Sequence, residues 1–200
     1  MKYANEIFFL VMSLIAWGLL YGSRFILTAG KASQAEKLWL TALTLTASSF
    51  TVFAVASTLS LSLLTLANTC FIASFVYFGL FCRSLNGPIT KHVHFIVFAG
   101  LLVFVAVFEY LRQKGLFVER VALISLVAAS CFVWELKELS RIKGIQSTQL
   151  WFLVYTIAME LFLTIARLVA LYVDGGLSAS NLYQELSLIH ISEPTRQAEI

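Results

Sequence analysis

The stretch Leu38–Cys82, LWLTALTLTASSFTVFAVASTLSLSLLTLANTCFIASFVYFGLFC, decides the fold because no charged side chain interrupts it. A bilayer core requires about 20 apolar residues for each helical span. The stretch is therefore long enough for two spans, and we expect the break between them at Ser57–Ser62. Similar apolar runs elsewhere bring the predicted spans to 6–24, 38–57, 61–82, 91–110, 119–138 and 148–173. The sequence predicts an all-α fold, a polytopic transmembrane helix bundle with six spans.

The composition excludes an ordinary soluble domain, because 60% of the residues are hydrophobic and only 12% are charged. The three cysteines are not paired by spacing and indicate small packing residues. The sequence contains neither a Gly-rich phosphate loop nor a metalloprotease or serine-hydrolase motif. We therefore predict no catalytic residue, no metal and no cofactor. We interpret the acid pair Glu135 and Glu138 as the solvated face of a cytoplasmic loop.

The last fifteen residues, LSLIHISEPTRQAEI at 186–200, resemble the in-frame translation of a transposase-type sequencing adapter. Such processing scars are excluded from fold reasoning. We therefore expect residues 1–185 to be a truncated membrane domain and 186–200 to be an artefact. A seventh span would follow in the intact protein.

The distribution of basic residues predicts the orientation, because short cytoplasmic loops carry an excess of Lys and Arg. Placing the first, third and fifth loops inside puts eight cations in the cytoplasm and leaves four on the other side. The eight are Arg24, Lys31, Lys37, Arg83, Lys91, Lys137, Arg141 and Lys143; the four are Lys2, Arg112, Lys114 and Arg120. This counting places the N-terminus outside. The positive net charge therefore reflects topology, and we predict no nucleic-acid partner.

Glu160 is the most informative polar residue inside the predicted membrane. A helix that enters near Leu150 places it about 15 Å deep, close to the midplane. Thr156, Glu160, Thr164 and Arg167 form one polar stripe by helical spacing. We expect this stripe to face the other helices, with Arg167 extending toward the outer interface. Glu160 is then either a ligand or proton site, or a neutral acid that is hydrogen-bonded to a neighbouring helix.

Asn68 is the second polar candidate and lies in the middle of the third span. A mid-span Asn usually forms a hydrogen bond between helices. The small residues Ala67, Ser74 and Gly79 of the same span would allow neighbouring helices to approach closely.

The third span also carries a family-like motif, Thr65-Leu-Ala-Asn-Thr69 followed by an apolar run and Phe81-Cys-Arg-Ser-Leu-Asn-Gly-Pro88. This pattern resembles the third helix of the membrane sensor regions that precede GGDEF domains in bacterial diguanylate cyclases. The residues that carry the resemblance are Leu66, Ala67, Asn68, Arg83, Gly87 and Pro88. Such regions have six or seven spans. Similar regions also precede histidine kinase cores.

The resemblance implies an N-terminal membrane anchor and sensory module of a signalling protein in the bacterial inner membrane. Its partners would be the lipid bilayer, a second copy in a homodimer and an unknown signal ligand. The chain contains no GG[DE]EF signature, so the cyclase activity would belong to a domain beyond it. Two alternatives stay open, namely the membrane region of a histidine kinase and a fragment of a small transporter or channel.

Overall fold

Six long helices make up the computed structural model, which describes residues 4–27, 33–59, 62–142 and 148–173. They are α1 (Ala4–Leu27), α2 (Gln34–Leu59), α3 (Leu63–Ser84), α4 (Lys91–Gln113), α5 (Phe117–Leu139) and α6 (Thr148–Val173). Each contains a segment that is long and apolar enough to cross a bilayer. Among the described residues this confirms the predicted all-α transmembrane bundle with six spans.

The helix ends follow local sequence signals. Ser33 and Glu36 form a capping box at the start of α2, in which the Ser33 amide donates to Glu36 Oε2 at 2.7 Å and the Glu36 amide donates to Ser33 Oγ at 3.2 Å. The expected break within the long apolar stretch is confirmed, because α2 ends at Leu59 and α3 begins at Leu63.

The turn between α3 and α4 uses the glycine and proline of the family-like motif. Gly87 adopts φ +151°, a conformation that other residues rarely take, and Pro88 follows it directly. Because proline lacks an amide hydrogen and restricts the residue before it, the chain cannot continue as helix here. The motif therefore fixes the point at which the chain reverses direction.

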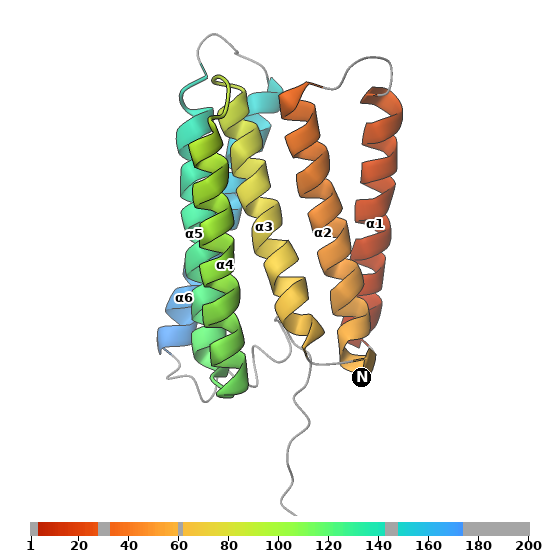
Figure 1. The fold of residues 1–200 in the computed structure, drawn as a ribbon, viewed down its shortest axis with the longest axis vertical. Coiled ribbons are helices and arrows are strands. Elements are labelled where there is room, and N and C mark those ends of the chain that lie inside the picture. Colours follow the sequence, from red (N-terminus) through yellow and green to blue (C-terminus); the bar gives the residue numbers. More distant parts are fainter. Residues whose placement is uncertain (1–3, 28–32, 60–61, 143–147, 174–200) are drawn as a thin grey trace, which may run out of the picture.

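The helices alternate in direction, and α3 lies at the centre (Figure 1). It packs against α2, α4 and α5, while α1 packs on α2 and α6 packs on α5. We call the end of the bundle where α3 and α5 finish the upper end, and the end where they begin the lower end, as drawn in Figure 1. Residues 186–200 lie outside the described residues, so the adapter assignment stays a prediction.

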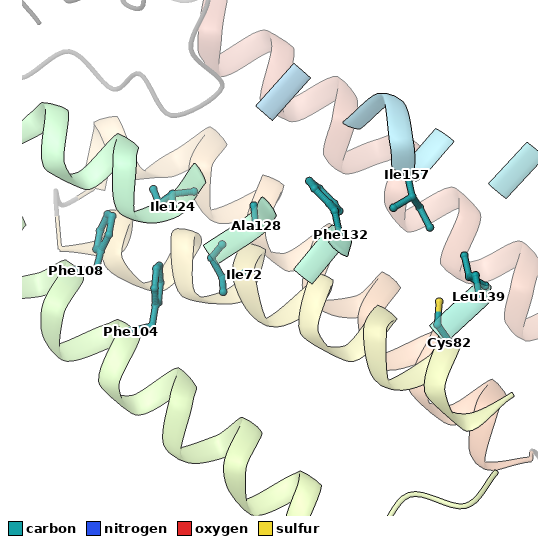
Figure 2. Close-up of a cluster of buried hydrophobic side chains, with 9 residues drawn as sticks. All are labelled: Ile72, Cys82, Phe104, Phe108, Ile124, Ala128, Phe132, Leu139 and Ile157. Atoms are coloured by element: carbon teal, nitrogen blue, oxygen red, sulfur yellow. The ribbon is translucent and has the colours of Figure 1, made fainter. Parts of the chain in front are cut away.

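Two large apolar clusters form the core of the described residues, beside a small one around Val121 and Leu171. One joins α3, α4, α5 and α6 and is shown in Figure 2. The other joins α1, α2 and α3 around Phe9 and Phe53. A path of aromatic contacts links the two, from Phe9 to Phe50, Phe71, Phe75 and Phe132, with ring centroids 4.7–6.3 Å apart. The helices from α1 to α5 therefore share one continuous packed interior.

The outer surface of the bundle is apolar, as a lipid-facing surface requires. On α4, for example, Phe95, Ile96 and Phe98 are all more than half exposed. A cavity of about 410 Å³ separates part of α4 from α3 and α5, and Gly100 lies on its wall. A Cβ atom added at Gly100 would meet no atom within 4 Å. Helix α4 is thus held less tightly in this region than α3 is.

Candidate functional site

A network of polar side chains joins α3 to α5 at the upper end of the bundle. Arg83 Nη1 of α3 lies 3.1 Å from Glu138 Oε1 of α5, and Arg141 Nη1 lies 3.3 Å from the same oxygen. The Trp134 indole donates to that oxygen at 3.2 Å, and Asn86 Nδ2 donates to the Glu138 carbonyl at 2.7 Å. We call these five residues the upper clamp. The side chain of Glu138 is 3% exposed, so its charge is compensated inside the protein.

Gly79 allows the upper clamp to form because it lets the Trp134 ring lie directly on the backbone of α3. A Cβ atom at this position would lie 2.7 Å from Trp134 Cε3. The prediction that Gly79 permits close helix packing is therefore confirmed. The predicted small residues Ala67 and Ser74 are also buried, at 0% and 3% exposure.

The lower end carries a second network, which we call the lower clamp. Thr65 Oγ1 of α3 donates to Glu109 Oε2 of α4 at 2.6 Å. Arg112 donates to both oxygens of Glu109, at 2.6 and 2.9 Å, and Gln113 adds a bond of 2.9 Å. Sequence reasoning did not single out Glu109, although its spacing from Arg112 is typical of a helical ion pair. The central helix α3 is thus tied to α5 at one end and to α4 at the other.

Asn68 does not form the expected bond between helices. Its side chain is fully buried, and Nδ2 donates to the carbonyl oxygen of Leu64 in the same helix at 2.8 Å. Its Oδ1 has no hydrogen-bond partner among the described residues. The bond that joins α2 to α3 here is made by Ser49, whose hydroxyl donates to the Ala67 carbonyl at 2.9 Å. Helix α2 therefore binds the backbone of the motif, beside Asn68.

The interpretation of Glu135 and Glu138 as a solvated loop is wrong. Both lie inside α5, with exposures of 0% and 2%. The buried positions of α5 recur every three to four residues, and Ala128, Cys131 and Glu135 follow this spacing. This helical period was the signal that would have placed the acids on the buried face. The predicted span 119–138 contains both acids, and the loop interpretation rested on their charged neighbours in the sequence.

Glu135 lies in an apolar environment at the contact between α3, α5 and α6. Phe132 and Leu139 flank it on α5 and belong to the same cluster as Cys82 of α3 and Ile157 of α6 (Figure 2). Neither carboxyl oxygen of Glu135 has a hydrogen-bond partner within the described part of the chain. Burial of a carboxyl group without a partner is costly, and such groups are typical of functional sites.

Glu160 lies at the edge of the contact between α5 and α6. Glu160 follows Ile157, the α6 residue that is buried in the cluster with Phe132 and Leu139, by three residues. Thr156, Thr164 and Arg167 of the polar stripe are half-buried, whereas Glu160 itself is exposed on the bundle surface. The expectation that Glu160 would face the bundle interior is therefore wrong, because the buried face of α6 is centred on Ile157 and Leu171.

Sequence reasoning thus singled out Glu160, which is exposed on α6, and misread Glu135, which is buried on α5. A buried carboxyl group without a hydrogen-bond partner, as at Glu135, can bind or release a proton, or attract a cation. No protein-family model matches this chain, and no curated protein or solved structure matches it either.

Proposed function

We propose that this chain is the N-terminal membrane anchor and sensory module of a bacterial signalling protein, a diguanylate cyclase whose catalytic domain follows the chain. In this proposal the upper end of the bundle faces the cytoplasm and the N-terminus lies outside the inner membrane. The intact protein would be a homodimer that responds to a signal not identified by the sequence.

The observation that carries the proposal is the unequal packing of the helices. Helix α3 buries 44% of its span, whereas α6, the last described helix, buries 6% of its span, the smallest share of the six. Helix α3 is fixed by the two clamps, whereas α6 is weakly buried. This arrangement is consistent with a module in which α6 moves relative to a fixed core. Shifts of one helix against packed neighbours are a common form of signal transmission. The signal would change the populations of two positions of α6 against the fixed helices, and this change would alter how two output domains pair.

The family-like motif gives further support, because its residues serve this arrangement. Arg83 belongs to the upper clamp, and Gly87 with Pro88 forms the turn that follows it. Ala67 accepts the hydrogen bond from α2. A pattern that first suggested the family thus coincides with the contacts that hold α3 in place.

The decisive experiment is to sequence the uninterrupted gene beyond codon 185. We expect one further span followed by a domain with a GG[DE]EF signature. The purified protein should then convert GTP to cyclic di-GMP. A histidine kinase core in that place would show that the chain is the membrane region of a histidine kinase. A stop codon soon after one more span would refute both the cyclase and the kinase proposals.

A transporter or channel is the second candidate, and it is favoured by the buried Glu135, whose carboxyl oxygens have no hydrogen-bond partner among the described residues. Intramembrane carboxyl groups without counter-charges often mark ion or proton pathways. Substrate uptake into proteoliposomes by the full-length protein, abolished in Glu160→Gln, would support this alternative. Uptake at the level of empty liposomes would exclude it.

A further inference from the structure

We propose that the cavity between α3, α4 and α5 binds one acyl chain of a surrounding phospholipid, and that the bound chain holds Trp134 in place. This site goes beyond the proposed signalling function, because it concerns the contact of the bundle with its lipid. It rests on the membrane-spanning helices and does not depend on any output domain.

The cavity is long and follows the helix axes. Val97 of α4 and Trp134 of α5 lie on its wall toward the upper end, and Val107 of α4 and Leu123 of α5 lie on its wall toward the lower end. Val97 and Val107 are ten residues apart, which corresponds to about 15 Å along the helix axis. The hydrocarbon core of a bilayer is about 30 Å thick, so one leaflet is about 15 Å deep. The cavity therefore has the length that one acyl chain of a leaflet occupies.

The cavity opens onto the outer surface of the bundle near the middle of the spans. Gly100 and Val103 of α4 and Ser130 of α5 lie on its wall and are exposed, so they form its rim. Ile72 of α3 and Phe104 of α4 are buried and form part of its inner wall (Figure 2). A lipid chain can therefore enter sideways from the bilayer without crossing a polar layer.

The wall offers no free partner to a polar occupant. Besides the Cys131 thiol, a weak donor, its polar side-chain groups are the Ser130 hydroxyl and the Trp134 indole. The hydroxyl donates to the Leu126 carbonyl at 2.8 Å, and the indole donates to Glu138 Oε1 at 3.2 Å. A buried water needs about two to four polar partners, so water does not fill this cavity.

The volume and the setting favour a hydrocarbon chain. The cavity measures about 410 Å³, whereas an apolar cavity of about 150 Å³ is already large enough to bind benzene. Side chains that line an empty cavity lose dispersion contacts, so an apolar occupant stabilises them. Acyl chains are the apolar groups that surround a lipid-facing opening at this depth. Helix α4 buries 11% of its span, and a bound chain would add to the contacts that hold it.

Trp134 connects the cavity to the upper clamp. Its ring lies against the backbone of α3 at Gly79 and also forms part of the cavity wall. An acyl chain in the cavity would leave the ring no space to move away from Gly79. The bound chain would thereby maintain the hydrogen bond from Trp134 to Glu138.

Fluorescence quenching by brominated lipids tests the site in the whole chain. The protein is placed in nanodiscs of a phospholipid that carries bromine at the middle of its acyl chains, and in nanodiscs of the same lipid without bromine. Trp17→Phe, Trp39→Phe and Trp151→Phe leave Trp134 as the fluorescent tryptophan. We expect bromine to quench Trp134. Gly100→Phe should remove most of this quenching, because the added ring enters the cavity from its rim.

Gly18→Phe is the matched control. A Cβ atom at Gly18 also meets no atom within 4 Å, but this residue lies on α1, which does not line the cavity. The control should keep the quenching. If Gly100→Phe does not fold, Ser130→Leu decides in the same assay, because it narrows the cavity from α5.

Absence of quenching in the parent protein would overturn the proposal. Equal quenching in the parent and in the cavity-filling variant would also overturn it, since the lipid that reaches Trp134 would then lie outside the cavity. Loss of quenching in Gly18→Phe as well would show that the effect is not specific to the cavity and would refute the site. Quenching that appears only after a brominated free fatty acid is added would refute a phospholipid chain as the occupant.

Discussion

Gly79→Ala tests the closest contact between α3 and α5. The added methyl group would lie 2.7 and 2.8 Å from two carbon atoms of the Trp134 ring, so the ring has to move. Overpacking of this kind costs about 1–3 kcal/mol. Displacing the indole also weakens its 3.2 Å hydrogen bond to Glu138, which contributes about 1 kcal/mol. Alanine in place of glycine within a helix offsets about 1 kcal/mol. We expect a net loss of about 1–3 kcal/mol in the free energy of unfolding.

Gly100→Ala is the matched control, because the same methyl group enters open space on α4. Only the helix-propensity gain applies there, so this variant should be stabilised by up to about 1 kcal/mol. Both free energies can be measured by reversible unfolding in mixed micelles, with tryptophan fluorescence as the signal. If Gly79→Ala proves as stable as Gly100→Ala, the contact with Trp134 is not as close as the structure has it, and the reasoning is wrong.

Three further predictions concern the polar contacts and use the same unfolding measurement. Glu138→Ala should lower the free energy of unfolding by about 2 kcal/mol and Arg83→Ala by about 1 kcal/mol, because Glu138 contacts several partners whereas Arg83 contacts one. The reverse order would contradict the upper clamp. Ser49→Ala should cost about 0.6–2 kcal/mol, since it removes a bond between helices. Its control Ser130→Ala, which removes a bond within α5, should cost less, and equal costs would contradict the assignment. Asn68→Ala should lower the free energy of unfolding by no more than about 2 kcal/mol and leave the signalling output of the full-length protein near normal. Loss of signalling output in a folded variant would show that Asn68 has a role beyond packing.

The spans were predictable because their physical cause is local. A long apolar run without charges has to form helices in a bilayer, where every backbone group must be satisfied within its own segment. The break near Ser57–Ser62 followed from length alone, and the helix boundaries at Leu59 and Leu63 agree with it. Gly79 was also predictable as a site of close approach, although its partner Trp134 was not.

The candidate site was harder to predict because its causes are not local. Glu135 and Glu138 lie close to charged residues in the sequence, which favoured a loop. Their burial depends on partners that are distant in the sequence, such as Arg83, 55 residues from Glu138. The direction of Glu160 depends on the rotation of α6, which is set by the apolar side chains that pack on α5. A polar stripe by itself does not determine that rotation.

The sidedness of the loops tests the six-span topology most directly, because six spans with the proposed orientation require opposite ends of the bundle to face opposite compartments. Gln34, at the start of α2, and Lys114, after α4, are exposed and lie at the upper and lower ends. Each is replaced by cysteine in turn and labelled in intact cells with a maleimide that does not cross membranes. We expect the label at Lys114 to form in intact cells and the label at Gln34 to form only after the membrane is opened. Labelling of both positions from the same side would contradict the six-span bundle, and the reverse pattern would contradict its orientation.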